Sequence, residues 1–127
     1  MDKFLISSAV TIIFSGALAA QTSTEQTKPV PVMLYPDPDH GTCSIGLQVN
    51  EGGAELRSGP GVSFPLVAIL EAGHVVSGCN EKNGWDGIID GQDETCSVGI
   101  SVATKRPYVG PCASGWINQS FLTSIYG

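Results

Sequence analysis

The four cysteines are the side chains of this 127-residue chain that are best suited to nucleophilic or metal chemistry. A thiolate beside a histidine can act as a nucleophile, and four thiolates can hold zinc. Successive cysteines are 36, 17 and 16 residues apart with no C-x-x-C pair, which argues against zinc. Two disulfides are the favoured interpretation, with free buried thiols as the alternative, because four cysteines in a short chain are typical of an oxidising compartment. The cysteines are Cys43, Cys79, Cys96 and Cys112.

No combination of residue types typical of an active site is present in the sequence. Ser63 lies in Gly-Val-Ser-Phe-Pro, which lacks the Gly-x-Ser-x-Gly pattern of a nucleophile elbow. His74 has no thiolate partner if all four cysteines are oxidised. Carboxylates gather from Asp86 to Glu94, but a glycosidase acid also needs an apolar pocket that raises its pKa, and residues 90–94 lack the alternating ligands of an EF-hand. We therefore predict a protein that is not an enzyme and binds no metal or cofactor.

The disulfide pairing follows from the spacing of the cysteines around a predicted hairpin. Four cysteines allow three pairings. Cys96 and Cys112 lie at equal distances from Thr104, and residues that face one another across a hairpin have Cα atoms about 4.5–5.5 Å apart, within disulfide range. We therefore predict Cys96–Cys112, which leaves Cys43–Cys79. The pairing Cys79–Cys96 is less favoured, because a strand of about 20 Å separates the two.

The elements that must position these residues are short β-strands. Runs of alternating or continuous apolar residues are broken by glycine turns, and no window has the 3.6-residue period of a helix. Within residues 91–113, residues 98–102 alternate and Tyr108–Val109 is the expected return strand, which predicts a hairpin. A short helical turn is expected at 120–122. The other predicted strands are 45–49, 54–57, 66–70, 74–79 and 85–90.

The N-terminal residues 1–20 are typical of an export signal. Lys3 precedes an apolar run from Phe4 to Phe14, and Ala17–Ala20 offers small residues for cleavage. The run is shorter than the ~20 residues of a membrane span, so a membrane anchor is the less favoured alternative. We predict a periplasmic or secreted protein without membrane insertion after cleavage.

Residues 21–41 are predicted to be a proline-rich linker, followed by one domain at 42–127. Its alternating prolines favour an extended backbone and forbid a helix. We expect no packed core before about Thr42, although Met33–Tyr35 could dock on the domain. The prolines that carry this prediction are Pro29, Pro31, Pro36 and Pro38.

The charge of the chain argues against two classes of partner. The net charge is −6, with 12 acidic and 6 basic residues, and removal of residues 1–20 takes one of each. Lys105–Arg106 is the only basic pair and is expected in an exposed turn. We therefore predict no binding to nucleic acid or to anionic membranes.

Three motifs in order resemble the bacterial SH3 domain, a small β-barrel of secreted and cell-wall proteins. They are Leu56-Arg57-Ser58-Gly59-Pro60, Gly84-Trp85 and Gly115-Trp116-Ile117, and the similarity covers about Ala54 to Leu122. The resemblance implies an all-β fold, here a small SH3-like barrel that carries the disulfide-bounded hairpin as an insertion. Family members usually have asparagine where Glu55 stands and a large aliphatic residue where Ala54 stands. No eukaryotic proline-recognition signature is present.

Aromatic side chains carry the remaining functional signal, because planar amphipathic rings bind sugars and peptides with little loss of entropy. The two tryptophans are expected to pack mainly against residues 58–65. Arg57 could pair with a ligand carboxylate, but we favour a role in holding that loop through its carbonyls. The candidate ligand-binding residues are Arg57, Phe64, Trp85, Tyr108 and Trp116.

The expected function is that of an exported, non-catalytic binding module. The resemblance implies peptidoglycan peptide or an envelope protein as the partner. The alternative is a secreted or periplasmic inhibitor or immunity-type protein that blocks an enzyme through the Cys96–Cys112 hairpin, with Lys105–Tyr108 near its tip. The sequence gives no indication of the oligomeric state.

Overall fold

The computed structural model describes residues 28–127, so the predicted signal segment lies outside the described residues. Seven strands form one antiparallel sheet in the order β4-β3-β8-β6-β5-β2-β9, and two short strands form a second one. The described residues contain no α-helix, which confirms the all-β class. The strands of the large sheet are β2 (Ile45–Val49), β3 (Ala54–Arg57), β4 (Leu66–Leu70), β5 (Val75–Lys82), β6 (Trp85–Ile89), β8 (Ser114–Asn118) and β9 (Leu122–Tyr126).

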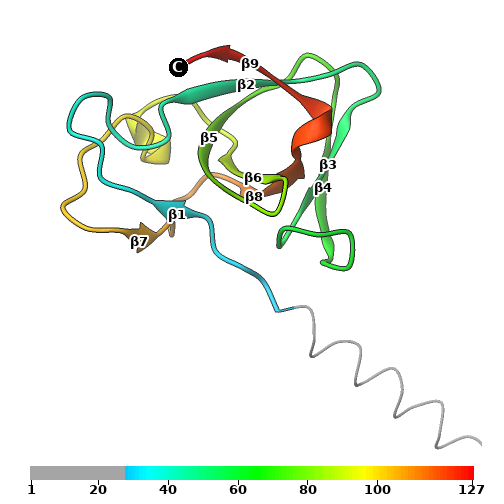
Figure 1. Cartoon of the computed structure of the whole chain (residues 1–127), viewed down its shortest axis with the longest axis horizontal. Helices are drawn as coiled ribbons and strands as arrows, with labels where there is room; N and C mark the ends of the chain where they lie inside the picture. The colour runs from blue at the N-terminus through cyan, green and yellow to red at the C-terminus, as the bar shows by residue number, and fades with distance from the viewer. Residues whose placement is uncertain (1–27) are drawn as a thin grey trace, which may run out of the picture.

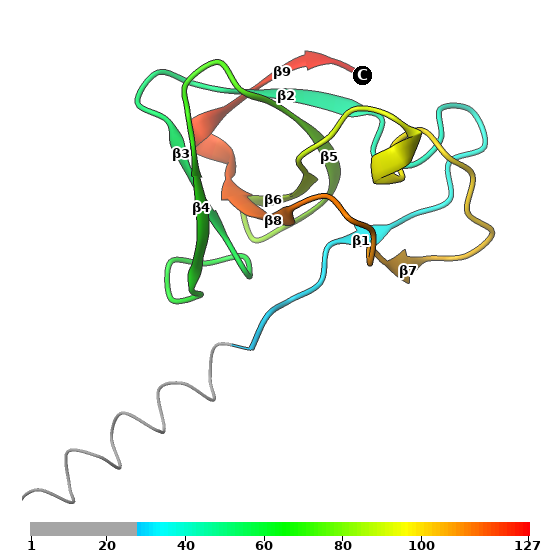
Figure 2. The same cartoon turned by 180° about the vertical axis from the view of Figure 1, so that it is seen from behind.

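The large sheet curls around its core but does not close by hydrogen bonds (Figures 1 and 2). Strands β4 and β9 are its two edges, and β3 meets β8 at the single pair Arg57–Trp116. The gap is filled by side chains, because Ala68 of β4 and Leu122 of β9 both pack on the core. The predicted barrel is therefore a curled open sheet in this protein. The expected helical turn is η3 (Gln119–Phe121), which joins β8 to β9.

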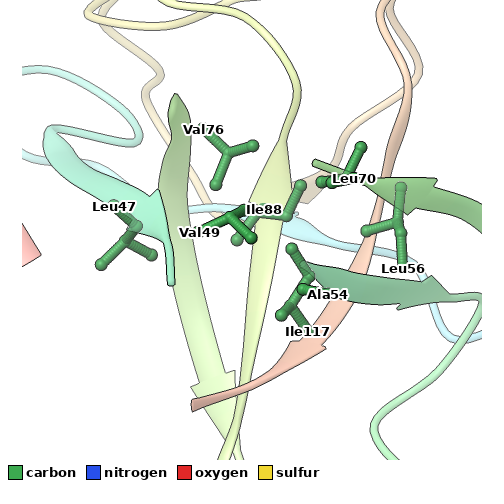
Figure 3. Close-up of a cluster of buried hydrophobic side chains, with 8 residues drawn as sticks. All are labelled: Leu47, Val49, Ala54, Leu56, Leu70, Val76, Ile88 and Ile117. Atoms are coloured by element: carbon green, nitrogen blue, oxygen red, sulfur yellow. The ribbon is translucent and has the colours of Figure 1, made fainter. Parts of the chain in front are cut away.

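The core follows from the period of two along the strands. Leu47 and Val49 of β2 and Ala54 and Leu56 of β3 point inward, whereas Glu55 between the latter two points to solvent. Each fully buried Leu, Ile or Val stabilises the fold by about 1.5–3 kcal/mol relative to an exposed one. Figure 3 shows the whole cluster: Leu47, Val49, Ala54, Leu56, Leu70, Val76, Ile88 and Ile117.

The structure joins Cys43 to Cys79 and Cys96 to Cys112, which are the two pairs favoured from the sequence. Cys79 lies in a β-bulge of β5, because Gly78 pairs with Ile88 whereas Asn80 pairs with Gly87. Such a bulge bends and twists its strand. The bend occurs where the disulfide ties β5 to Cys43, just before β2.

The predicted hairpin within residues 91–113 is wrong. The chain forms a 3-10 turn, η2 (Glu94–Cys96), and then the short strand β7 (Arg106–Pro107), which pairs with β1 (Met33–Leu34). Thr42 N donates to Ile100 O at 2.9 Å, and Thr42 O accepts from Gly99 N at 2.7 Å. Outside the segment itself, most of its backbone partners therefore come from residues 32–42, and residues 98–102 form no strand.

The N-terminal segment is packed on the domain from Val30 onward, so the prediction of no core before Thr42 is also wrong. Val32 and Leu34 are each 2% exposed, and Figure 1 shows β1 beside β7 at one end of the molecule. Tyr108 N donates to Val32 O at 2.8 Å. Prolines did not prevent packing, because an extended chain still presents alternate side chains to one face.

Candidate functional site

A pocket of about 470 Å³ lies over β2, β5, β6, β9 and η3, and it has an apolar part and an acidic part. Its apolar lining comes from Ile45, Leu47, Cys79 and Leu122. Its polar lining comes from Asn80, Glu81, Asp86, Gln119 and Ser124. This combination of apolar surface with a few converging polar groups is typical of ligand sites.

The acidic part is positioned by the β5–β6 hairpin. Asn83 and Gly84 both have positive φ, 55° and 84°, as a two-residue type I′ turn requires. This tight turn sets the register, so Glu81 faces Asp86 directly across the two strands. Like charges in such a pair destabilise a hairpin. The sheet therefore places two carboxylates together at a cost that a third group must offset.

Gln119 is that third group. Its Nε2 donates to Glu81 Oε2 at 2.5 Å and to Asp86 Oδ1 at 3.0 Å. Its own backbone N donates to Gly84 O at 3.0 Å, which fixes η3 against the hairpin turn. Because both carboxylate oxygens bind the same nitrogen, their separation cannot exceed the sum of the two hydrogen-bond lengths.

Partial burial raises the pKa of Asp86 above its ordinary value of 3.8. The amide of Gln119 opposes this rise in pKa by stabilising the charged form, and the negative charge of Glu81 adds to the rise. Within residues 28–127, neither carboxylate forms an ion pair with a lysine, arginine or histidine. A cation entering the pocket would relieve the repulsion between the two carboxylates, and its charge would offset the desolvation of Asp86.

The apolar part depends on a glycine. A Cβ atom on Gly78 would lie 2.9 Å from Leu47 Cδ1, so a larger residue there would force this leucine side chain to move. Ile45, opposite Gly78 in the register, is partly exposed at the pocket. The pocket thus suits a ligand that carries an ammonium group on a partly apolar scaffold.

None of the five residues selected from the sequence lines this pocket. Trp85 and Trp116 are buried together under Val32, and Trp116 Nε1 donates to Val30 O at 2.8 Å. Tyr108 is buried in a cluster with both disulfides, and its hydroxyl accepts from Cys112 N at 2.9 Å. These three side chains are covered by the chain itself.

Arg57 and Phe64 meet at the loop between β3 and β4. Arg57 Nη1 donates to Phe64 O at 2.8 Å, and Nη2 donates to Glu55 Oε1 at 2.7 Å. The ring of Phe64 packs on Gly59, where a Cβ atom would lie 2.3 Å from it. Arg57 therefore holds the loop through a carbonyl, which is the role favoured from the sequence.

The remaining titratable candidates have local partners. His74 Nε2 lies 2.7 Å from Asp90 Oδ1 near the protein surface. Asp93 caps η2 by accepting from Thr95 N and Thr95 Oγ1, and these bonds lower the pKa of Asp93. In the part of the chain that the structure describes, no three His, Cys, Asp or Glu side chains are grouped to hold a metal ion.

Comparison with family models, with curated proteins and with solved structures found no match to this chain. A helix long and apolar enough to cross a membrane is likewise not found among residues 28–127.

Sequence reasoning placed Asp86 in an acidic cluster but missed its partners. The Asn83-Gly84 dipeptide is a strong hairpin signal and could have shown that Glu81 faces Asp86. Gln119 carried no such signal, because its position depends on how β8 packs beside β6.

Proposed function

We propose that this protein is an exported, non-catalytic SH3-like binding module that holds an amine-bearing peptide in the pocket over β2, β5, β6, β9 and η3. The peptide stems of peptidoglycan, which carry diamino acids, are the leading ligand, and an envelope protein with an exposed amine is the alternative. The observation that carries the proposal is the facing pair Glu81 and Asp86, bridged only by the Gln119 amide beside an apolar wall.

The chemistry of the pair supports an ammonium ligand. Two carboxylates offer several acceptor lone pairs, and the Gln119 amide uses one site on each. Hydrogen bonds between an ammonium group and a carboxylate are charge-assisted and are about twice as strong as neutral ones. The net charge of −6 also favours the approach of a cationic partner.

The covalent structure supports the location. Two disulfides, with no free cysteine among residues 28–127, indicate an oxidising, extracytoplasmic environment. An amine-bearing peptide of the envelope would meet the protein in that compartment.

The test is co-sedimentation with purified peptidoglycan whose amines are either free or acetylated. The double variant Glu81→Gln, Asp86→Asn should bind about tenfold more weakly or worse, because each change removes a charge-assisted bond. The control Glu51→Gln removes a charge at an exposed turn and should bind like the wild type.

Acetylated peptidoglycan should not retain the wild-type protein. Equal retention of the acetylated and free forms would contradict amine recognition. Retention no better than that of an unrelated acidic protein would contradict the cell wall as the ligand.

A further inference from the structure

Residues 103–107 are a run of exposed residues at the periphery of the molecule, and they end in β7 (Figures 1 and 2). The residues on either side of this run are anchored. Val102 packs on the cluster that contains the disulfides, and Tyr108 is buried within it. Residues 103–107 therefore form an exposed loop whose two ends are held by the domain, and we call it the 103–107 loop.

Backbone contacts with the N-terminal segment hold the 103–107 loop in an extended conformation. Its last two residues form β7, which pairs antiparallel with β1. Before the loop, Thr42 N donates to Ile100 O at 2.9 Å. Directly after the loop, Tyr108 N donates to Val32 O at 2.8 Å. Because the backbone is fixed on both sides before any partner binds, binding of the loop costs little conformational entropy.

Lys105 is the charged side chain at the centre of this region. Its Nζ lies 5.7 Å from the centroid of the Tyr35 ring, which is 43% exposed, so the charge lies at the protein surface. Within residues 28–127, Lys105 forms no ion pair with a carboxylate. A lysine on an exposed, extended chain fits an acidic specificity pocket such as that of trypsin-like serine proteases.

The other lysines and arginines of residues 28–127 are not presented in this way. Lys28 and Arg106 each precede a proline, whose ring crowds the peptide bond and hinders its hydrolysis. Arg57 is held by hydrogen bonds to a carbonyl and to a carboxylate. Lys82 directly precedes the tight turn between β5 and β6. The bond from Lys105 to Arg106 is therefore the one that the cleft of such a protease could receive.

The disulfide between Cys96 and Cys112 encloses this bond. Hydrolysis would add water across the bond, leaving a carboxylate on Lys105 and an amine on Arg106. Both new ends would stay in one covalent framework, so the amine would remain at high effective concentration for the reverse reaction. A protease would therefore retain and reseal the loop, which is the behaviour of an inhibitor rather than of a substrate.

We propose that the 103–107 loop binds a secreted trypsin-like serine protease, with Lys105 in the acidic specificity pocket of the enzyme. The two disulfides indicate the oxidising, extracytoplasmic environment in which secreted proteases act. The proposal is independent of the amine-binding pocket, since none of the residues that line that pocket lies in the loop.

Inhibition of trypsin, measured by hydrolysis of a small chromogenic substrate, tests this loop. The wild type should inhibit trypsin, and it should inhibit chymotrypsin, whose pocket is apolar, about 100-fold more weakly or worse. Lys105→Ala should weaken the inhibition of trypsin by about 100-fold, because a central anchor carries most of the binding energy of an interface. The control Lys82→Ala removes the same charge at another exposed position and should inhibit like the wild type.

The variant Lys105→Phe provides a gain of function that a damaged fold could not produce. It should lose the inhibition of trypsin and acquire inhibition of chymotrypsin. Mass spectrometry after incubation with trypsin should find the wild type intact, or cut only after Lys105 with its fragments still joined by a disulfide. A wild type that does not inhibit trypsin, undiminished inhibition by Lys105→Ala, or rapid cleavage at several bonds would each overturn the proposal.

Discussion

Trp85 and Asp86 are neighbours on β6, yet Trp85 lies in a buried cluster and Asp86 lies in an open pocket. Because successive residues of a strand point to opposite faces, Trp85 packs under Val32 of the N-terminal segment while Asp86 lines the pocket. The tryptophan cluster is covered by the chain, and the indole N–H of Trp116 has an acceptor in Val30 O. The carboxylates of the pocket share one amide.

This comparison shows why a prediction based on residue type alone selected aromatic residues that do not line the pocket. Aromatic residues bury a large apolar area and serve a core as well as they serve a ligand. A pair of facing carboxylates without a cation has no comparable structural use, and at Asp86 burial and the charge of Glu81 outweigh the stabilisation by the Gln119 amide. Glu81 and Asp86 therefore are the side chains that still have acceptor sites for a cationic ligand.

The largest expected effect comes from the tryptophan side. Trp116 is 1% exposed, so Trp116→Ala should lower the free energy of unfolding by about 3–5 kcal/mol, measured by denaturant titration. Ligand binding should weaken only to the extent that the protein unfolds. If binding were lost with stability unchanged, Trp116 would be a ligand residue and the comparison would fail.

Removing either disulfide should lower stability, but only one of the two disulfides contributes a residue to the pocket. Removing Cys96–Cys112 or Cys43–Cys79 with paired serines should cost about 3 and about 4 kcal/mol, since they close loops of 16 and 36 residues. Thermal unfolding measures the stability that is lost in each variant. Because Cys79 lines the pocket, only the second pair should also weaken ligand binding while the protein remains folded. Equal effects on binding would show that the two regions are coupled.

A smaller effect is expected from the bridging amide. Gln119→Ala should leave Glu81 and Asp86 facing one another without a shared donor, and the pKa of Asp86 should rise further. Carboxyl chemical shifts followed by NMR across a pH titration measure this rise. An unchanged titration of Asp86 would mean that the amide does not hold the pair.

The smallest effect concerns pH and stability. The pKa of Asp86 is higher in the folded chain than its ordinary value of 3.8, so the folded state binds this proton more tightly. The contribution of Asp86 to stability therefore falls as the pH rises from 3.8 through the raised pKa. Asp86→Asn removes that fall and should stabilise the protein at neutral pH by less than about 1 kcal/mol, because the group is partly exposed.

Denaturant titrations at neutral pH and below pH 3.8 measure this difference. The advantage of Asp86→Asn should disappear at the lower pH, where aspartate is protonated in both states. An advantage that persists there would have a cause other than the charge. By the same reasoning, an amine ligand should bind more weakly as the pH falls through the pKa of Asp86.

The disulfides show how a correct prediction can depend on incorrect geometry. Cys96–Cys112 was expected across a hairpin centred on Thr104, whereas the structure places Cys96 in η2 and Cys112 just before β8. Asp90 N donates to Ala113 O, which brings the two ends of the segment together without a hairpin. The spacing of the cysteines was informative because a disulfide requires only that the two cysteines lie close together, whatever conformation the residues between them adopt.

The N-terminal segment shows the opposite case. Its prolines predicted an extended backbone, but among the described residues only Met33–Leu34 forms a strand and residues 38–40 form a turn. Val30, Val32 and Leu34 nevertheless pack on the domain. Their period of two was present in the sequence. The surfaces that they cover could not be inferred without the fold: Val30 and Val32 pack on the two tryptophans, whereas Leu34 packs in the cluster that contains the disulfides.

The sequence by itself determined strands β2 to β6 and the turn between β5 and β6, because period and turn residues act locally along the chain. It also led to the correct cysteine pairs, although the hairpin that supported one of them does not form. Only the tertiary structure decided that the tryptophans are covered and that Gln119 bridges Glu81 to Asp86. These contacts join residues far apart in the sequence, and they form where packing of the whole sheet brings the strands together. Local pattern contains no information on that packing, so it could identify the residue types but not the neighbours that set their roles.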